Sequence, residues 1–145
     1  MIRSNPWQSY RQVATKTASP GQLVLMLFDG AIRFLDRANA GFLLEDPAEF
    51  NMTIGNNVLK AQAIITELND ALDMKRGGEF SSTMRRLYHY MDRRLDESNV
   101  KKEPEGINDT LRRLTLLRDA WFQMLQQGGQ PVPEAQWAQL ALTAA

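Results

Sequence analysis

The side chains that most often carry chemistry in proteins are scarce in this sequence, because its 145 residues include one histidine, His89, and no cysteine. An exposed histidine on a helical bundle accepts the phosphoryl group in phosphotransfer proteins, and His89 falls on the polar face of a predicted helix. That class carries a lysine and a glycine soon after the histidine, whereas Tyr90-Met91-Asp92-Arg93 follow it here. A histidine phosphotransfer bundle is therefore a disfavoured alternative.

Other catalytic arrangements find no better support in the residue types. A di-metal bundle needs a Glu-x-x-His pair on each of two helices, which one histidine does not provide. The glycine patterns of nucleophilic serine turns, phosphate loops and dinucleotide sites do not occur. The acids Glu67, Asp70 and Asp73 spread along one predicted helix, as on a solvated face. We predict no catalytic residue, no metal site, no cofactor and no enzymatic activity.

The amino-acid composition limits the kinds of molecule that this protein is expected to bind. Seventeen basic and seventeen acidic residues balance, so no net field would hold the chain on nucleic acid or an anionic membrane. The longest apolar stretch, Leu23 to Phe28, is too short to span a bilayer, and the N-terminus lacks the apolar run of a signal peptide. The absence of cysteine suits a reducing cytoplasm. We expect a cytoplasmic protein without nucleic acid or membrane insertion, which recognises partners by shape and apolar contact.

Start and stop signals in the sequence predict where the helices begin and end. A capping residue followed by proline begins a helix at Ser19-Pro20 and at Asp46-Pro47. Positive charge followed by glycine, as in Lys75-Arg76-Gly77-Gly78, is typical of a helix C-terminus. These signals predict a short helix at 6–15 and long helices at 20–44, 47–75, 80–102 and 104–127.

Apolar residues recur three and four positions apart in each long segment, as in Ile54, Val58 and Ala61, and no alternating strand pattern of useful length occurs. Four long amphipathic helices joined by short connections predict an all-α fold, an antiparallel up-down four-helix bundle. The chain then divides into an N-terminal capping segment at 1–18, the bundle at 19–127 and a C-terminal tail at 128–145, flexible or loosely docked.

The segment 20–44 has more apolar surface than one core contact requires. Its polar residues, Asp29 and Arg33 among them, occupy roughly a quarter of the helix circumference, while an apolar arc of only about 100° suffices to face a core. The segment either contacts two neighbouring helices or borders a groove for an apolar partner helix. The candidate groove residues are Leu23, Leu27, Phe28, Gly30, Ile32 and Leu35. Arg118, near the middle of another apolar stripe, is expected to pair with an acid.

Five segments, in order and at matching spacing, resemble the flagellar secretion chaperones of the FliS type. They are Thr17-Ala18-Ser19-Pro20, Leu25-Met26-Leu27-Phe28-Asp29-Gly30-Ala31, Leu72-Asp73-Met74-Lys75-Arg76-Gly77-Gly78-Glu79, Leu87-Tyr88-His89-Tyr90-Met91-Asp92-Arg93-Arg94-Leu95 and Leu117-Arg118-Asp119-Ala120-Trp121. The resemblance implies a cytoplasmic helical bundle that binds the C-terminal region of flagellin, prevents its premature polymerisation and delivers it to the flagellar type III secretion apparatus. It implies a monomer or weak homodimer when free. A helical adaptor for another flagellar protein is the alternative.

The resemblance also assigns a role to the chain termini. The N-terminal segment, with Trp7, Tyr10 and Val13, would cover the groove when no client is bound, and Tyr10 would contact the export gate protein once client is loaded. Phe28 stands where the family often has tyrosine, which removes a hydroxyl. The stretch beyond Gly129 extends past the usual end of the family, and its Trp137 is expected to dock as a second cover or to stay disordered.

Overall fold

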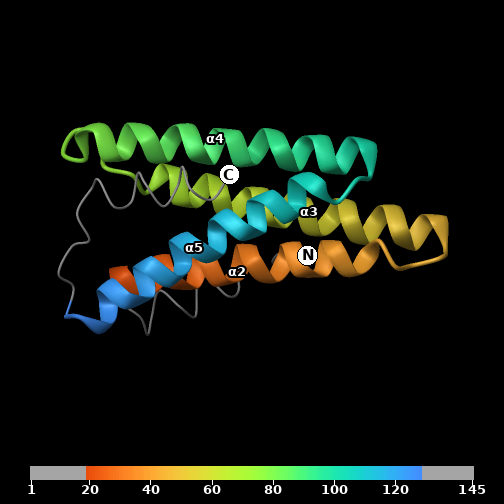
Figure 1. Cartoon of the computed structure of the whole chain (residues 1–145), viewed down its shortest axis with the longest axis horizontal. Coiled ribbons are helices and arrows are strands. Elements are labelled where there is room, and N and C mark those ends of the chain that lie inside the picture. Colours follow the sequence, from red (N-terminus) through yellow and green to blue (C-terminus); the bar gives the residue numbers. More distant parts are fainter. Residues whose placement is uncertain (1–18, 129–145) are drawn as a thin grey trace, which may run out of the picture.

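The helix starts follow from side-chain caps placed before proline. The Ser19 hydroxyl accepts the N–H of Gln22, whose side chain accepts the N–H of Ser19 in return, and the Asp46 carboxylate accepts the N–H of Glu49. The computed structural model describes residues 19–128, which form helices α2 (Pro20–Gly41), α3 (Pro47–Asp70), α4 (Gly78–Lys101) and α5 (Glu105–Gln126) (Figure 1). This described part contains no strand, which confirms the predicted all-α class.

Consecutive helices run in opposite directions, as an up-down bundle requires (Figure 1). Helix α2 packs against α3 and α5, and α4 packs against the same two helices from the other side. The apolar stripes predicted from the sequence meet in the centre, where Ile54, Met91 and Leu114 are 0% exposed. No helix within 19–128 has the length and apolar character to cross a membrane. The predicted helix at 6–15 and the tail residue Trp137 lie outside the described residues.

Two helices end earlier than the sequence predicts. Helix α2 stops at Gly41 rather than at residue 44. A Cβ atom on Gly41 would lie 3.0 Å from both Ile54 and Thr53 of α3. Helix α3 stops at Asp70 rather than residue 75, so the stop signal assigned to 75–78 was wrong. The carboxylate of Asp73 accepts backbone N–H groups that a continued helix would need, which offers the chain an alternative to helical hydrogen bonds.

Helices α4 and α5 are in backbone contact beside the loop that joins them. A Cβ atom on Gly106 would lie 2.1 Å from the carbonyl oxygen of Arg94, so glycine is required for this approach. The Ser98 hydroxyl accepts the N–H of Ile107 at 3.0 Å, which satisfies a donor in the first turn of α5. In Figure 1, α5 then runs obliquely from this end of α4 to the N-terminal end of α2.

Replacement of Gly106 by alanine is expected to lower the free energy of unfolding by about 1 to 3 kcal/mol, because the added methyl group forces two helices apart. Gly55 in α3 provides the control, since a Cβ atom there would meet only the side chains of Asn99 and Lys102, at 3.4 and 3.8 Å. Gly55→Ala should raise stability by about 0.5 to 1 kcal/mol through helix propensity. Urea unfolding measures both, and equal effects would contradict the assigned contact.

Candidate functional site

An apolar pocket opens at the end of the bundle away from the α4–α5 loop. It has a volume of about 300 Å³, at the lower limit of ligand pockets, and all four described helices contribute to it. Helix α2 supplies two residues, α5 supplies one, and the end of α3, its loop and the first half of α4 supply the rest. The lining residues are Val24, Phe28, Leu68, Ala71, Leu72, Asp73, Arg76, Gly77, Phe80, Ser81, Met84, Tyr88 and Trp121.

The α3–α4 loop forms one wall of the pocket, and its own hydrogen bonds fix its shape. The Asp73 carboxylate accepts the N–H groups of Lys75 and Arg76 at 3.0 Å each. The Asp73 carbonyl accepts the N–H of Gly77 at 2.8 Å and the hydroxyl of Ser81 at 2.9 Å. A Cβ atom on Gly77 would lie 1.7 Å from the Ser81 hydroxyl oxygen, so this tight turn requires glycine.

The opposite wall is fixed by two contacts between α5 and α2. The Trp121 indole N–H donates to the carbonyl of Gly21 at 2.8 Å, so a pocket-lining aromatic ring is held at a defined angle. The Arg118 guanidinium pairs with Asp29 at 2.8 Å, which confirms the expectation that Arg118 pairs with an acid. The hydrogen bond to Asp29 raises the pKa of Arg118 above its ordinary value. These contacts set the separation of α2 and α5 at the pocket.

Tyr88 places a polar group in the apolar wall. The residue is 4% exposed and lines the pocket, and its hydroxyl makes no hydrogen bond within residues 19–128. Burial raises the pKa of Tyr88, so the hydroxyl is neutral and able to donate. A client group with a polar atom in the pocket would offer this hydroxyl an acceptor.

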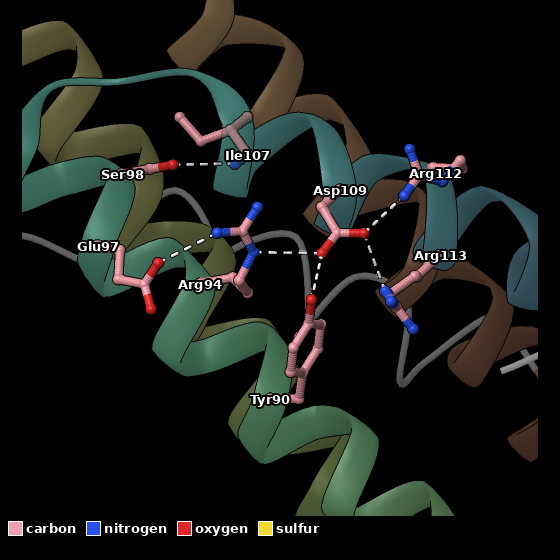
Figure 2. Close-up of polar contacts among 8 residues, drawn as sticks. All are labelled: Tyr90, Arg94, Glu97, Ser98, Ile107, Asp109, Arg112 and Arg113. Atoms are coloured by element: carbon pink, nitrogen blue, oxygen red, sulfur yellow. Dashed lines mark hydrogen bonds and ion pairs between the residues drawn. The ribbon is translucent and has the colours of Figure 1, made fainter. Parts of the chain in front are cut away.

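The other end of the α4–α5 pair is held by the carboxylate of Asp109, which is 8% exposed. Figure 2 shows it between both helices: Tyr90 donates to it at 2.6 Å and Arg94 at 3.2 Å from α4, while Arg112 and Arg113 reach it from α5 at 2.8 and 3.0 Å. Arg113 also lies over the Tyr90 ring, 4.6 Å from its centroid. We call these five residues the Asp109 network.

Opposing effects set the charge state of Asp109. Burial raises the pKa of its carboxyl group, but the Tyr90 hydrogen bond and the contacts with Arg113 and Arg94 outweigh burial and lower the pKa below its ordinary value. The carboxylate is therefore ionised at neutral pH and accepts every one of these donors. The network ties α4 to α5 near their loop, while the opposite halves of both helices line the pocket.

The residues predicted to border a groove have different surroundings. Phe28 is 2% exposed and lines the pocket, whereas Leu35 is 0% exposed and belongs to the central core. The rest are buried or half-buried on α2 and lie outside the pocket: Leu23, Leu27, Gly30 and Ile32. Contact between these six residues and a client stays a prediction. Trp7, Tyr10 and Val13 lie outside the described residues.

Sequence reasoning missed most of the pocket, including Leu72, Phe80 and Trp121. A signal was available, because four of the five segments that carry the family resemblance contribute to its walls, among them Leu72 to Glu79 and Leu117 to Trp121. The structure brings no three histidine or acidic side chains of residues 19–128 together as a metal site. His89 is exposed on α4, as predicted, with its Nε2 atom 3.5 Å from the Asn69 amide nitrogen.

The architecture and the pocket together define a class, that of antiparallel helical bundles with an apolar pocket between their helices. Comparison with known proteins identifies the family within this class. The chain belongs to the FliS family, since the family model described as flagellar protein FliS matches residues 3–128. This confirms the resemblance seen in the sequence.

Individual relatives agree with this assignment. The chain is 37% identical over 126 residues to the flagellar secretion chaperone FliS of Bacillus subtilis, which covers 87% of this chain and 90% of that protein. It is 36% identical over 129 residues to the flagellar secretion chaperone FliS of Salmonella typhimurium, with coverage of 86% and 93%. A protein of the same name from Escherichia coli is 33% identical over 132 residues, with coverage of 86% and 93%.

Asp109→Asn is expected to lower the free energy of unfolding by about 3 kcal/mol at pH 7, because it leaves the buried Arg113 guanidinium and the donors beside it without their charged acceptor. Since the folded pKa of Asp109 lies below the unfolded value of about 3.9, the network stabilises the fold fully above that value and less as pH falls through the folded pKa. The deficit of the variant relative to the wild type should therefore shrink in acid.

Asp119→Asn is the matched control for this prediction. Asp119 pairs with Arg118 at 3.3 Å, but its side chain is 57% exposed, so its loss should change stability by no more than about 0.5 kcal/mol. Urea unfolding at a series of pH values measures both variants. Equal effects of the two substitutions, or a deficit of Asp109→Asn that does not depend on pH, would show that the Asp109 charge does not hold the helices together.

Proposed function

We propose that this chain is a cytoplasmic export chaperone that binds the C-terminal region of flagellin, prevents its premature polymerisation and delivers it to the flagellar type III secretion apparatus. Membership of the FliS family carries the proposal, because it supports an export chaperone role and points to a protein that is not an enzyme. The relatives are named flagellar secretion chaperones, and flagellin as the client of this chain is our inference.

The pocket supports this proposal because it supplies part of the apolar contact that coupled folding and binding needs. A disordered client segment must bury enough apolar surface to offset the cost of ordering, which is about 2 to 5 kcal/mol. Apolar burial contributes roughly 25 cal/mol per Å², so the client needs a wide apolar contact. The pocket offers several large apolar side chains in one place, with Trp121 held at a fixed angle. An amphipathic client helix would insert its largest side chains there.

The finer parts of the proposal concern the remaining candidate residues. The groove along α2, with Leu23, Leu27, Phe28, Gly30, Ile32 and Leu35, would extend the contact beyond the pocket. The N-terminal segment, with Trp7, Tyr10 and Val13, would cover the site without client and contact the export gate protein with client. The free protein would be a monomer or a weak homodimer.

Calorimetric titration with the C-terminal segment of flagellin from the same organism tests the function directly. One-to-one binding accompanied by a gain in helical circular dichroism would support it. A version of the chain that lacks residues 1–18 should bind the same segment at least as well, since the proposed cover is then gone. Absence of binding by both well-folded proteins would contradict flagellin as the client and favour an adaptor for another flagellar protein.

Leu72→Glu is expected to weaken flagellin binding at least tenfold, because it places a charge in the apolar wall where client side chains would lie. Leu59→Glu provides the matched control: Leu59 is 59% exposed on α3 and does not line the pocket. Titration calorimetry measures affinity, and thermal unfolding shows whether each variant stays folded. Equal affinity of two folded variants would place the client contact elsewhere on the bundle.

A further inference from the structure

We propose that the pocket selects a client segment in which a carboxylate lies beside the apolar side chain that enters, and that the guanidinium of Arg76 binds this carboxylate. The inference rests on the proposed function and adds the chemistry of the recognised segment. It identifies Arg76 as a specificity-determining residue on the α3–α4 loop.

Arg76 is a pocket-lining cation without an acidic partner among the described residues. Arg76 forms no salt bridge with any acid of residues 19–128, and its only hydrogen bond there comes from its backbone. The nearby arginine of the opposite wall differs, because Arg118 is paired with both Asp29 and Asp119. The guanidinium of Arg76 is therefore available to an incoming anion.

Asp73, the acid that also lines the pocket, is hydrogen-bonded within its own loop. Its carboxylate accepts two backbone N–H groups, from Lys75 and from Arg76 itself, and lies beyond ion-pair distance of the Arg76 guanidinium. The Asp73 carboxylate thus stabilises the loop and does not neutralise Arg76. The same hydrogen bonds fix the backbone of Arg76, and Gly77 confines the turn that follows it. The guanidinium extends from a backbone position that is already defined at the pocket.

A guanidinium presents a planar set of N–H donors that matches a carboxylate, and it pairs with one through two parallel hydrogen bonds. The rest of the lining is mainly apolar, so a client that fills the pocket would exclude water beside Arg76 and strengthen the attraction. In a polypeptide client, the carboxylate is either an acidic side chain or the C-terminal carboxyl group.

The test uses the C-terminal segment of flagellin from the same organism as the probe, with Arg76→Gln compared against Lys75→Gln. Both substitutions remove one positive charge from the same loop, but Lys75 does not line the pocket. We expect Arg76→Gln to weaken binding about three- to tenfold in low salt and to reduce the salt dependence of association, as loss of a specific charge pair does. Lys75→Gln should change affinity less than twofold, and Arg76→Lys should keep part of the binding.

Altered probes identify the source of the carboxylate. One arm uses the segment with an amidated C-terminus, and the other replaces each acidic side chain by its amide in turn. The probe change that removes the partner should weaken binding to the wild type and have no further effect on Arg76→Gln. Two results would overturn the inference and leave the function intact. One is tight wild-type binding with equal losses of affinity in Arg76→Gln and Lys75→Gln. The other is that, for every altered probe, the loss caused by the probe change is the same in Arg76→Gln as in the wild type. Failure of the wild type to bind would overturn both.

Discussion

The constraint on which this bundle depends is that α5 is tied to α4 at one end only. The Asp109 network and the glycine contact at Gly106 hold the two helices together beside their loop. Toward its other end α5 is bound to α2, through Trp121 and Arg118. Because α5 is tied to α4 only beside their loop, its final turns leave the early turns of α4 incompletely covered, and the pocket forms there.

Polar contacts in this structure define helix positions more than they add stability. A buried ion pair gains little over well-packed apolar residues, because removing its charges from water offsets most of the attraction. Its geometry is demanding, however, and Asp109 is satisfied only when donors from α4 and α5 are both in register. Apolar packing by itself specifies the position of a helix less sharply than directional hydrogen bonds do. The polar ties at both ends of α5 exclude a rotation or shift of the helix and so fix the shape of the pocket.

The sequence predicts the helices better than the pocket, for a physical reason. Caps and apolar periodicity are local, so Ser19, Asp46 and the stripe through Ile54 indicated where α2 and α3 begin and which face is buried. The end of α3 depends on Asp73, whose carboxylate competes for backbone N–H groups in a way that charge and glycine patterns do not reveal. The broad apolar arc of α2 likewise does not say which of its residues meet a neighbouring helix.

That ambiguity reflects how the pocket is made. Phe28 and Leu35 lie on the same helix and are both nearly inaccessible, yet only Phe28 lines the pocket, because the neighbours of α2 differ along its length. A partner seated in the pocket would contact all four helices at once, so its binding free energy would oppose separation of any pair. A ligand at 100 times its Kd stabilises the folded state by about 2.7 kcal/mol. In a site shared by all four described helices, that stabilisation applies to the described bundle as a whole, so a bound partner would make it more rigid.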